Sequence, residues 1–166
     1  VLAPTGIAAV NVGGQTMHSF FRIPFKPLLP DDPDFSVKHL RQRLKYPKAL
    51  CKLIKKLELI IIDEISMVRA DLLDAVDMTL RKYRRNDRPF GGVQLLMIGD
   101  LQQLTPVVTD EDAQLLSSYY PTPYFFGSRA LSQIDYVTIE LKQVYRQQDE
   151  EFISILNSVR SGRPSP

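Results

Sequence analysis

The sequence predicts an α/β fold with a mostly parallel sheet flanked by helices, and three observations carry this prediction. Residues 59–62, "LIII", form a continuous aliphatic run, which is typical of a strand covered on both faces and therefore of a parallel sheet. Apolar residues then recur at helical spacing between Leu72 and Tyr83, so a helix should follow this strand and pack back on the sheet. After the turn "RPFGG", the segment "VQLLMIGD" predicts a second buried strand. Because strand and helix alternate, the class is α/β.

The remaining elements extend this alternation toward both ends of the chain. "VLAP" predicts the end of a buried strand, and "TGIAAVNV" predicts a short helix closed by Gly13 and Gly14. Residues 24–36 contain four prolines, so we expect an irregular excursion, followed by basic helical stretches interrupted at Pro47. "PYFF", helix-like "SRALSQ" and a strand "YVTIEL" come next. The apolar positions of "DEEFISILNSVRSG" share one face of a last helix.

The composition is that of a globular domain. The 166 residues are 44% hydrophobic and 24% charged. Apolar runs are far shorter than the roughly 20 residues that a bilayer-spanning helix needs, and no signal-like segment opens the chain. We therefore expect a soluble intracellular protein with no membrane partner. The single cysteine, Cys51, excludes an internal disulfide and a cysteine-based zinc site.

Positive charge is concentrated in two clusters, although the net charge is only +2. Eight Lys or Arg residues and no acid lie between Phe35 and Leu57, and five more lie in residues 81–88, opposed only by Asp87. Each cluster alone could be an ordinary solvated face. Together they favour a surface for a phosphate backbone.

Three acids follow the predicted strands at the edge where open α/β sheets bind ligands: Asp63, Glu64 and Asp100. Such a carboxylate must be solvated, hydrogen-bonded or facing a cation, and a helix or turn cap is the structural alternative. An acid pair after a hydrophobic strand is typical of the second half of a nucleotide-hydrolysing site, with Asp63 on Mg²⁺ and Glu64 polarising the attacking water. The first half, G-x-x-x-x-G-K-[ST], does not occur in these residues. We therefore expect a segment of a longer protein that starts in mid-fold.

Five blocks occur in an order that resembles the superfamily-one DNA helicases of the PIF (petite integration frequency) family, relatives of the RecD helicases. They are "APTGIAA", "GGQTMHSFF", "IIIDEISMV", "RPFGGVQLLMIGDLQQLTPV" and "LKQVYRQQDEEFISILNSVRSG". The resemblance implies a RecA-like P-loop NTPase domain that lacks its N-terminal P-loop strand and helix. Residues 1–21 and 51–166 would form the partial motor domain, and residues 22–50 a small inserted wedge-like segment. One departure is Thr105, where the family usually has a second proline.

The resemblance also implies roles at the ATP site. Asp63 matches the family's magnesium ligand and Glu64 its catalytic acid. Gln103 matches the glutamine that senses the γ-phosphate, and a neutral amide can do this as donor and acceptor. Arg146 matches the arginine that reaches the γ-phosphate, with a surface salt bridge as its structural alternative. Asp100 would support the Gln103 loop or the attacking water.

The first two blocks resemble the DNA side of the family. There, Thr5 and the backbone at the helix start would bind phosphate, while the small residues Gly6 and Ala8 permit close approach. Thr16 and His18 match a further strand-contacting block, although a lone histidine is often only a structural hydrogen-bonding group. The adjacent residues 20 and 21, both phenylalanine, could stack on bases, with at least one of them expected in the core.

The function implied by the resemblance is that of part of an ATP-dependent 5′-to-3′ DNA helicase, with Mg²⁺ as cofactor and ATP as substrate. Its partners would be single-stranded DNA, forked duplex DNA and the remainder of the helicase chain, in the nucleus or mitochondrion of a eukaryote or the cytoplasm of a bacterium. The isolated segment should not hydrolyse ATP and should be poorly stable, because it lacks the strand that we place in mid-sheet beside residues 59–62.

Two alternatives stay open. One is a helicase domain of the RecD or conjugative-relaxase type, against which "PFGGVQLL" argues. The other is a single-stranded nucleic-acid-binding module that has lost catalysis. A pure binding module has no need of Asp63, Glu64, Gln103 and Arg146 together, so their joint presence weighs against decay.

Overall fold

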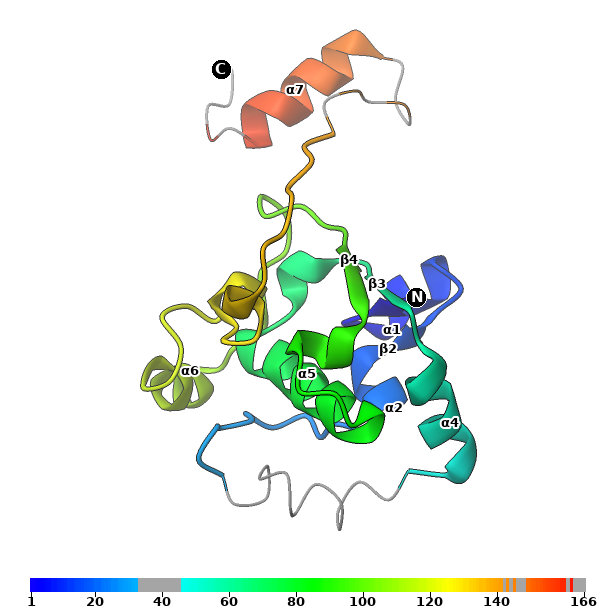
Figure 1. Cartoon of the computed structure of the whole chain (residues 1–166). Helices are drawn as coiled ribbons and strands as arrows, with labels where there is room; N and C mark the ends of the chain where they lie inside the picture. The colour runs from blue at the N-terminus through cyan, green and yellow to red at the C-terminus, as the bar shows by residue number, and fades with distance from the viewer. Residues whose placement is uncertain (33–45, 142, 144, 146–148, 161, 163–166) are drawn as a thin grey trace. The chain divides into compact units, whose positions relative to one another are not determined.

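The computed structural model describes residues 1–32, 46–141, 143, 145, 149–160 and 162 (Figure 1). The chain divides into two compact units, Val1–Asp135 and Tyr136–Pro166. The sheet and the candidate site residues described below all belong to the first unit. Among the described residues, no helix is long and apolar enough to cross a membrane.

The first unit is built on a sheet of four parallel strands, which confirms the predicted fold class. The strands are β1 (Leu2–Ala3), β2 (Gln15–Thr16), β3 (Leu59–Ile62) and β4 (Gln94–Met97), in the order β2-β1-β3-β4. Leu2 of β1 is in register with Ile62 at the carboxyl end of β3, and β3 and β4 pair along their full length. The carboxyl ends of all four strands therefore lie at one edge.

Helices follow the strands, and those at residues 6–11, 48–56 and 70–84 lie where the sequence predicts helices. The helices of the first unit are α1 (Gly6–Asn11), α2 (Met17–Phe21), α4 (Lys48–Lys56), α5 (Ala70–Arg84) and α6 (Asp110–Ser117). Short 3₁₀ turns occur at Ile65–Met67, Pro89–Gly92, Phe125–Gly127 and Leu131–Gln133. Threonine hydroxyls cap α1, α2 and α6, because each accepts a hydrogen bond from a backbone N–H of the first turn.

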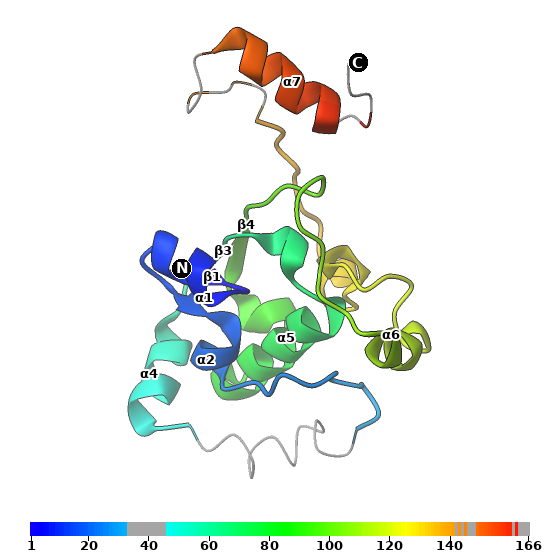
Figure 2. The same ribbon diagram turned by 180° about the vertical axis from the view of Figure 1, so that it is seen from behind.

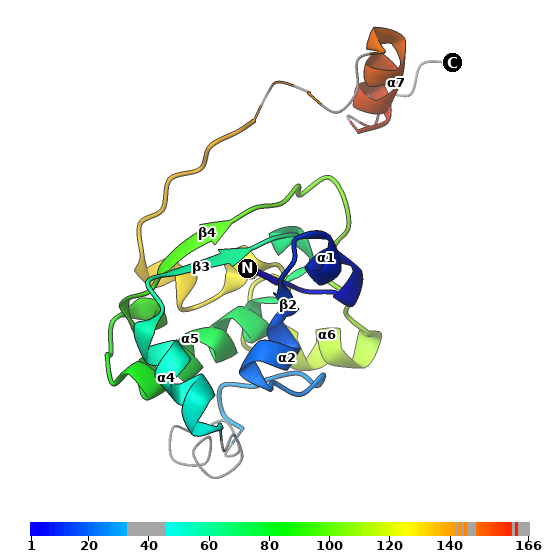
Figure 3. The ribbon, with the colours of Figure 1, turned by 90° about the vertical axis from the view of Figure 1, so that its right-hand side faces the viewer.

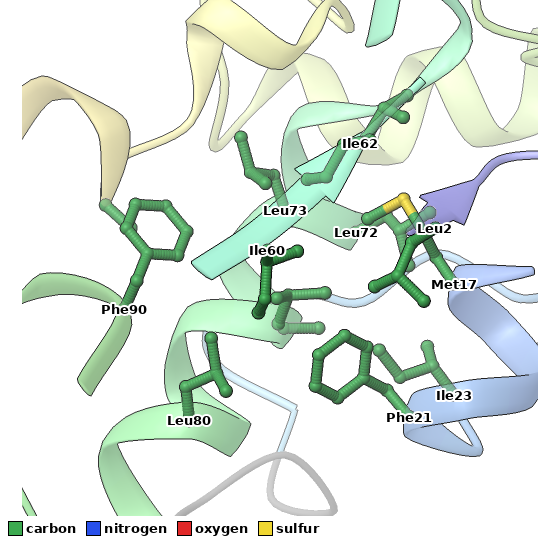
Figure 4. Close-up of a cluster of buried hydrophobic side chains, with 14 of the residues drawn as sticks. Leu2, Met17, Phe21, Ile23, Ile60, Ile62, Leu72, Leu73, Leu80 and Phe90 are labelled. Carbon is green, nitrogen blue, oxygen red and sulfur yellow. The ribbon is translucent and has the colours of Figure 1, made fainter. Parts of the chain in front are cut away.

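The core lies between the sheet and helices α2, α4 and α5, which sit together on one side of β3 and β4 (Figure 3). Figure 4 shows Ile60 and Ile62 of β3 within a cluster that includes Leu73 of α5 and Phe21 of α2. Fully burying one such side chain contributes about 1.5–3 kcal/mol. The alternate residues of the aliphatic run therefore hold α5 against the sheet.

The opposite face of the sheet is less covered than the sequence suggested. Leu59, Leu96 and Ile98 are 43%, 46% and 45% exposed, whereas Ile60 and Ile62 on the other face are buried. The prediction that both strands are buried on two faces was wrong. The physical reason is that α2, α4 and α5 pack on a single face in the described part of this unit.

Two further predictions about strands were also wrong. The missing strand cannot lie beside residues 59–62, because β1 pairs with one edge of β3 and β4 with the other. Within the described residues, only β2 and β4 have a free edge. Residues 136–141, "YVTIEL", form no strand, and Val137, Ile139 and Leu141 are 88%, 79% and 88% exposed. Alternation favours a strand, but a strand needs a partner, and no pairing involves these residues.

The "RPFGG" turn packs tightly against α5 and sets the start of β4. Phe90 is 1% exposed and enters the core. Gly91 has φ of 60°, and a Cβ there would lie 2.8 Å from the backbone oxygen of Leu80. Only glycine satisfies both the left-handed backbone and this close approach.

Asp71 of α5 holds the 22–32 excursion against the helix. Its side chain is buried and accepts hydrogen bonds from Arg69 Nε at 2.9 Å, Arg69 Nη2 at 2.7 Å and Leu28 N at 3.0 Å. Arg69 also contacts Asp112 of α6 at 3.3 Å. One buried carboxylate thus ties two distant segments to α5.

Two more aspartates of α5 act in the same way on other loops. Asp74 accepts hydrogen bonds from three donors of the turn at residues 128–130. Asp77 accepts from Arg81 Nε at 2.8 Å and from the backbone N–H of Phe90. Burial raises the pKa of Asp77, and the hydrogen bonds from Arg81 and Phe90 oppose this shift.

The expected wedge-like segment, residues 22–50, is continuous with the main core at both of its ends. Ile23, Leu28 and Tyr46 are buried in the same cluster as β3, and α4 begins at Lys48, directly after Pro47. Residues 33–45, which include much of the first basic cluster, lie outside the described residues. A separate inserted segment stays a prediction.

In the second unit, the predicted last helix is present as α7 (Glu150–Arg160). Its apolar residues Phe152, Leu156 and Val159 are 44%, 49% and 61% exposed. The helix was therefore predicted correctly, but its apolar face packs against no core within the described part of this unit.

Candidate functional site

The acid pair lies at the carboxyl end of β3. The backbone N–H of Asp63 donates to Leu2 O of β1, and that of Ile65 donates to Ile98 O beyond β4, both at 2.9 Å. These bonds fix the chain on either side of Glu64. Both acidic side chains are half-buried, and within the described residues neither has a hydrogen bond or an ion pair. Two carboxylates held at a sheet edge are thus available to a ligand.

Glu64 also has an unusual backbone, with φ of 51° and ψ of 44°. A residue other than glycine in this left-handed region costs on the order of 1–3 kcal/mol. Arg22 and Arg85 share this conformation as the residues that end α2 and α5, which is a common way to close a helix. Glu64 ends no helix, and the backbone hydrogen bonds of Asp63 and Ile65 on either side of it hold its main chain in this conformation.

The turn after β4 lies beside the acid pair. A Cβ at Gly99 would lie 2.9 Å from Ile65 Cγ2 and 3.0 Å from Ile65 N, so glycine allows the two turns to approach. Asp100 accepts hydrogen bonds from the backbone N–H of Gln102 at 3.0 Å and from Gln103 Nε2 at 3.1 Å. The exposed amide of Gln103 is therefore oriented by Asp100.

Thr5, Gly6 and Ala8 lie at the start of α1, directly beyond β1. Thr5 Oγ1 accepts the N–H of Ala8 at 3.2 Å, which leaves the hydroxyl hydrogen free to donate to a ligand. Gly6 is exposed, and no atom of the described residues lies within 4 Å of the place a Cβ would take. Ala8 packs instead against Ala3 and Ala9, so its side chain faces the protein.

Thr16 is the last residue of β2 and caps α2, and His18 lies in the first turn of that helix. Thr16 Oγ1 accepts the N–H of Ser19 at 3.2 Å. His18 is half-buried, and burial lowers its pKa, with a smaller lowering from the positive charge of Arg69 and an opposing effect of Asp71. The imidazole is thus neutral near pH 7. Its buried Nδ1 has no hydrogen-bond partner in the described part of the chain.

The two phenylalanines after His18 are directed largely toward the core. Phe21 is 0% exposed and lies in the core, as expected for at least one of the two. Phe20 packs against the same cluster, and its ring meets that of Phe21 edge to face at 4.8 Å. The exposed aromatic of this region is Phe25, which the sequence analysis did not single out. Its position between two prolines was the available signal.

The strand order places the expected site residues along one edge of the sheet. Thr16 ends β2 and Thr5 follows β1, and the ends of these two strands form what we call the DNA half. The acid pair and Gln103 follow β3 and β4 and form the ATP half. The two halves adjoin between β1 and β3, whose labels lie near that of α1 in Figure 2. Arg146 lies outside the described residues.

A hollow of about 670 Å³ lies away from this edge. It is lined by residues at the amino ends of β1 and β3, by residues 13–15 and by residues of α2 and α4, and by none of the expected site residues. Figure 2 shows the ribbons of β1, β3, α2 and α4 from behind. Among the described residues, no three His, Cys, Asp or Glu side chains gather as a metal site. The expected site residues therefore lie at the open edge of the sheet and not in this hollow.

Comparisons with known proteins agree on one family. The family model described as PIF1-like helicase matches residues 1–165. The ATP-dependent DNA helicase PIF1 of Saccharomyces cerevisiae (strain YJM789) is 40% identical over 163 residues, which are 98% of this chain and 17% of that protein. The chain therefore spans about a sixth of this relative's length.

Two solved structures are similar over 99% of this chain, each at 43% identity. One is a crystal structure of Pif1 helicase from Bacteroides in complex with ADP-AlF3 and ssDNA, with a TM-score of 0.91 and 36% of that chain covered. The other concerns DNA unwinding at forked dsDNA by two coordinating Pif1 helicases, with a TM-score of 0.90 and 38% covered.

Proposed function

This chain belongs to the PIF1-like helicase family, and from that premise we propose that it is the part of an ATP-dependent 5′-to-3′ DNA helicase that supplies hydrolytic acids and a single-strand surface. The observation that carries the proposal is the shared sheet edge. Two unpartnered carboxylates and an oriented glutamine lie beside two threonines at helix starts, all beyond the ends of adjacent parallel strands.

In the ATP half, Asp63 would hold Mg²⁺ and Glu64 would act on water. The residues fit the ion, because magnesium is usually bound by one or two carboxylates together with substrate phosphates, and the carboxylate of Asp63 has no donor among the described residues. When bound, Mg²⁺ neutralises charge on the phosphates. Glu64 would orient the attacking water and accept its proton at the carboxyl end of β3, where the backbone hydrogen bonds of Asp63 and Ile65 hold its main chain.

Gln103 would report the presence of the γ-phosphate to the rest of the domain. Its amide is held at 3.1 Å by Asp100, so a phosphate that competes for the amide also loosens the turn at residues 100–103. Arg146 would add positive charge that stabilises the transition state, an effect of about 10³–10⁵ in rate where it has been measured.

In the DNA half, Thr5 and Thr16 would donate hydroxyl hydrogens to successive phosphates of a single strand. Each hydroxyl is oriented by the backbone N–H that it accepts. The bond from Asp63 N to Leu2 O joins the two halves directly, since β1 continues into Thr5. A shift at the acid pair is thereby transmitted to the strand-binding backbone.

The proposed catalytic role is tested in the full-length protein by single-strand-stimulated ATP hydrolysis. We expect Glu64→Gln to lower turnover by about 10²–10⁴-fold, which is the usual contribution of a positioned acid or base. Glu58→Gln is the matched control, because Glu58 precedes the other end of β3 and is exposed. Preserved turnover in the Glu64 variant would refute the role, and a parent protein that binds DNA without hydrolysing ATP would favour a binding module.

The direction of movement needs its own assay. We expect the full-length protein to displace a strand from a duplex with a 5′ single-stranded tail and to leave a duplex with only a 3′ tail intact. Equal displacement of both substrates would contradict the assigned direction.

A further inference from the structure

We propose that Phe25 is a base-stacking contact for single-stranded DNA, held in position by the ring of His18. This inference rests on the proposed function and extends its DNA half to a residue that none of the expected strand contacts includes. The ligand is an unpaired nucleobase, which offers a flat aromatic face of any sequence.

The loop that carries Phe25 is anchored on both sides. Ile23 and Leu28 are 3% and 5% exposed, and the N–H of Leu28 donates to the buried carboxylate of Asp71 at 3.0 Å. Residues 24 and 27 are prolines, which restrict the backbone on either side of the ring. A short, restrained loop with buried ends thus presents one large aromatic residue outward.

The Phe25 ring is exposed but not freely rotating. It is 86% exposed, and it stacks on the ring of His18 with centroids 4.3 Å apart and planes 15° apart. One ring face is therefore occupied and the other is open to solvent. An exposed phenylalanine forgoes the stabilisation that burial would give, whereas a ring already held in one orientation loses little further entropy when a base stacks on it.

The position of the stack favours DNA over other occupants. His18 lies two residues beyond Thr16, the cap of α2 at the end of β2, so Phe25 adjoins the DNA half. Residues 1–32 contain three phenylalanines and no tyrosine or tryptophan; Phe21 lies in the core and Phe20 is half-buried against it. Phe25 is thus the aromatic surface that this part of the chain offers to a base whose phosphate lies at Thr16.

The first test measures binding of single-stranded oligo-dT to the full-length protein by fluorescence anisotropy. We expect Phe25→Ala and Phe25→Leu to weaken binding about tenfold and Phe25→Tyr to retain it, because only a ring can stack on a base. Phe126→Ala removes a 45% exposed aromatic from another turn and should have no effect. Binding by Phe25→Leu as tight as that of the parent would overturn the proposal.

A second test removes the base instead of the ring. One abasic nucleotide moved along the oligo-dT should weaken binding to the parent at a particular position and leave binding to Phe25→Ala unchanged at that position. The same abasic penalty in both proteins would overturn the proposal, because the lost base would then contact something else.

A third test uses fluorescence and distinguishes a failure of the stacking contact from a failure of the proposed function. The 166 residues contain no tryptophan, and the emission that Phe25→Trp adds over that of the parent protein, taken as a difference, reports on this position. We expect oligo-dT to quench this emission, and unchanged emission at saturating DNA would overturn the stacking contact.

A parent protein that binds DNA and hydrolyses ATP while Phe25→Ala behaves identically refutes this inference alone. A parent that does not bind single strands refutes the proposed function itself.

Discussion

The carboxylates of α5 and those at the end of β3 lie in the same unit but differ in what their oxygens contact. Asp71, Asp74 and Asp77 each accept hydrogen bonds from loops distant in sequence. Asp63 and Glu64 have no such partner among the described residues. A half-buried carboxylate without a donor costs free energy in the absence of a ligand. The comparison indicates that the α5 acids maintain the fold, whereas the strand-end acids are reserved for chemistry.

Removing the charge of Asp71 should have the largest effect on stability. Asp71→Asn leaves Arg69 without its buried partner, and breaking such a pair typically costs 3–5 kcal/mol. We expect about 3 kcal/mol, the low end of the range given for buried pairs, because Arg69 retains its 3.3 Å contact with Asp112. Faster hydrogen exchange of α5 amides than in the parent protein measures this loss of local stability. Asp112→Asn is the control, and an equal loss there would contradict the ranking.

The same substitution at the strand end should act on catalysis instead. We expect Asp63→Asn to reduce single-strand-stimulated ATP hydrolysis about 10²-fold or more, in line with loss of a group that acts on transferring phosphates. The local free energy of opening of α5, measured by hydrogen exchange of its amides, should stay within about 0.5 kcal/mol of the parent value. A loss of stability that accounts for the lost activity would break the comparison.

Asp74→Asn tests whether an α5 acid with backbone partners is also structural. We expect a loss of about 1–3 kcal/mol, since donors of the 128–130 turn lose a charged acceptor. The matched readout is turnover measured well below the unfolding temperature, which should be close to that of the parent. Loss of turnover without loss of stability would contradict this and would place Asp74 among the acids that act in ATP hydrolysis.

The smallest effect concerns His18, whose pKa is lowered by burial and by Arg69 and raised by Asp71. Because the unfolded chain takes up the proton first, stability is full above pH 6.5 and declines as the pH falls through and below that value. We expect His18→Asn to flatten this decline in the urea midpoint measured on either side of pH 6.5. A midpoint with the same pH dependence in both proteins would contradict the shift.

The sequence predicted the centre of this fold well because local patterns determine it. The aliphatic run at residues 59–62 and the helical spacing after Leu72 gave β3 and α5, and Thr5 with Gly13 bounded α1. The acids at the strand ends followed from the parallel topology. These features need only neighbouring residues, or the rule that parallel strands end at one edge.

Features that depend on distant partners were missed or wrong. Asp71 contacts Leu28 across 43 positions, and Asp74 contacts residue 130 across 56. Their spacing of three residues in the otherwise apolar first half of α5 was a signal, but it does not identify the donors. Residues 136–141 have a strand pattern without a strand partner, and the uncovered face of β3 could not be foreseen from its aliphatic run.

The measurement that most directly tests the division between the two sets of acids is hydrogen exchange of the full-length protein with and without a non-hydrolysable ATP analogue and Mg²⁺. The account predicts slower exchange of amides in residues 63–67 and 99–103 on addition of the ligand, with α5 and the 128–130 turn unchanged. It also predicts that Asp63→Asn abolishes this protection. Protection centred on α5 and the 128–130 turn, with residues 63–67 unaffected, would contradict it.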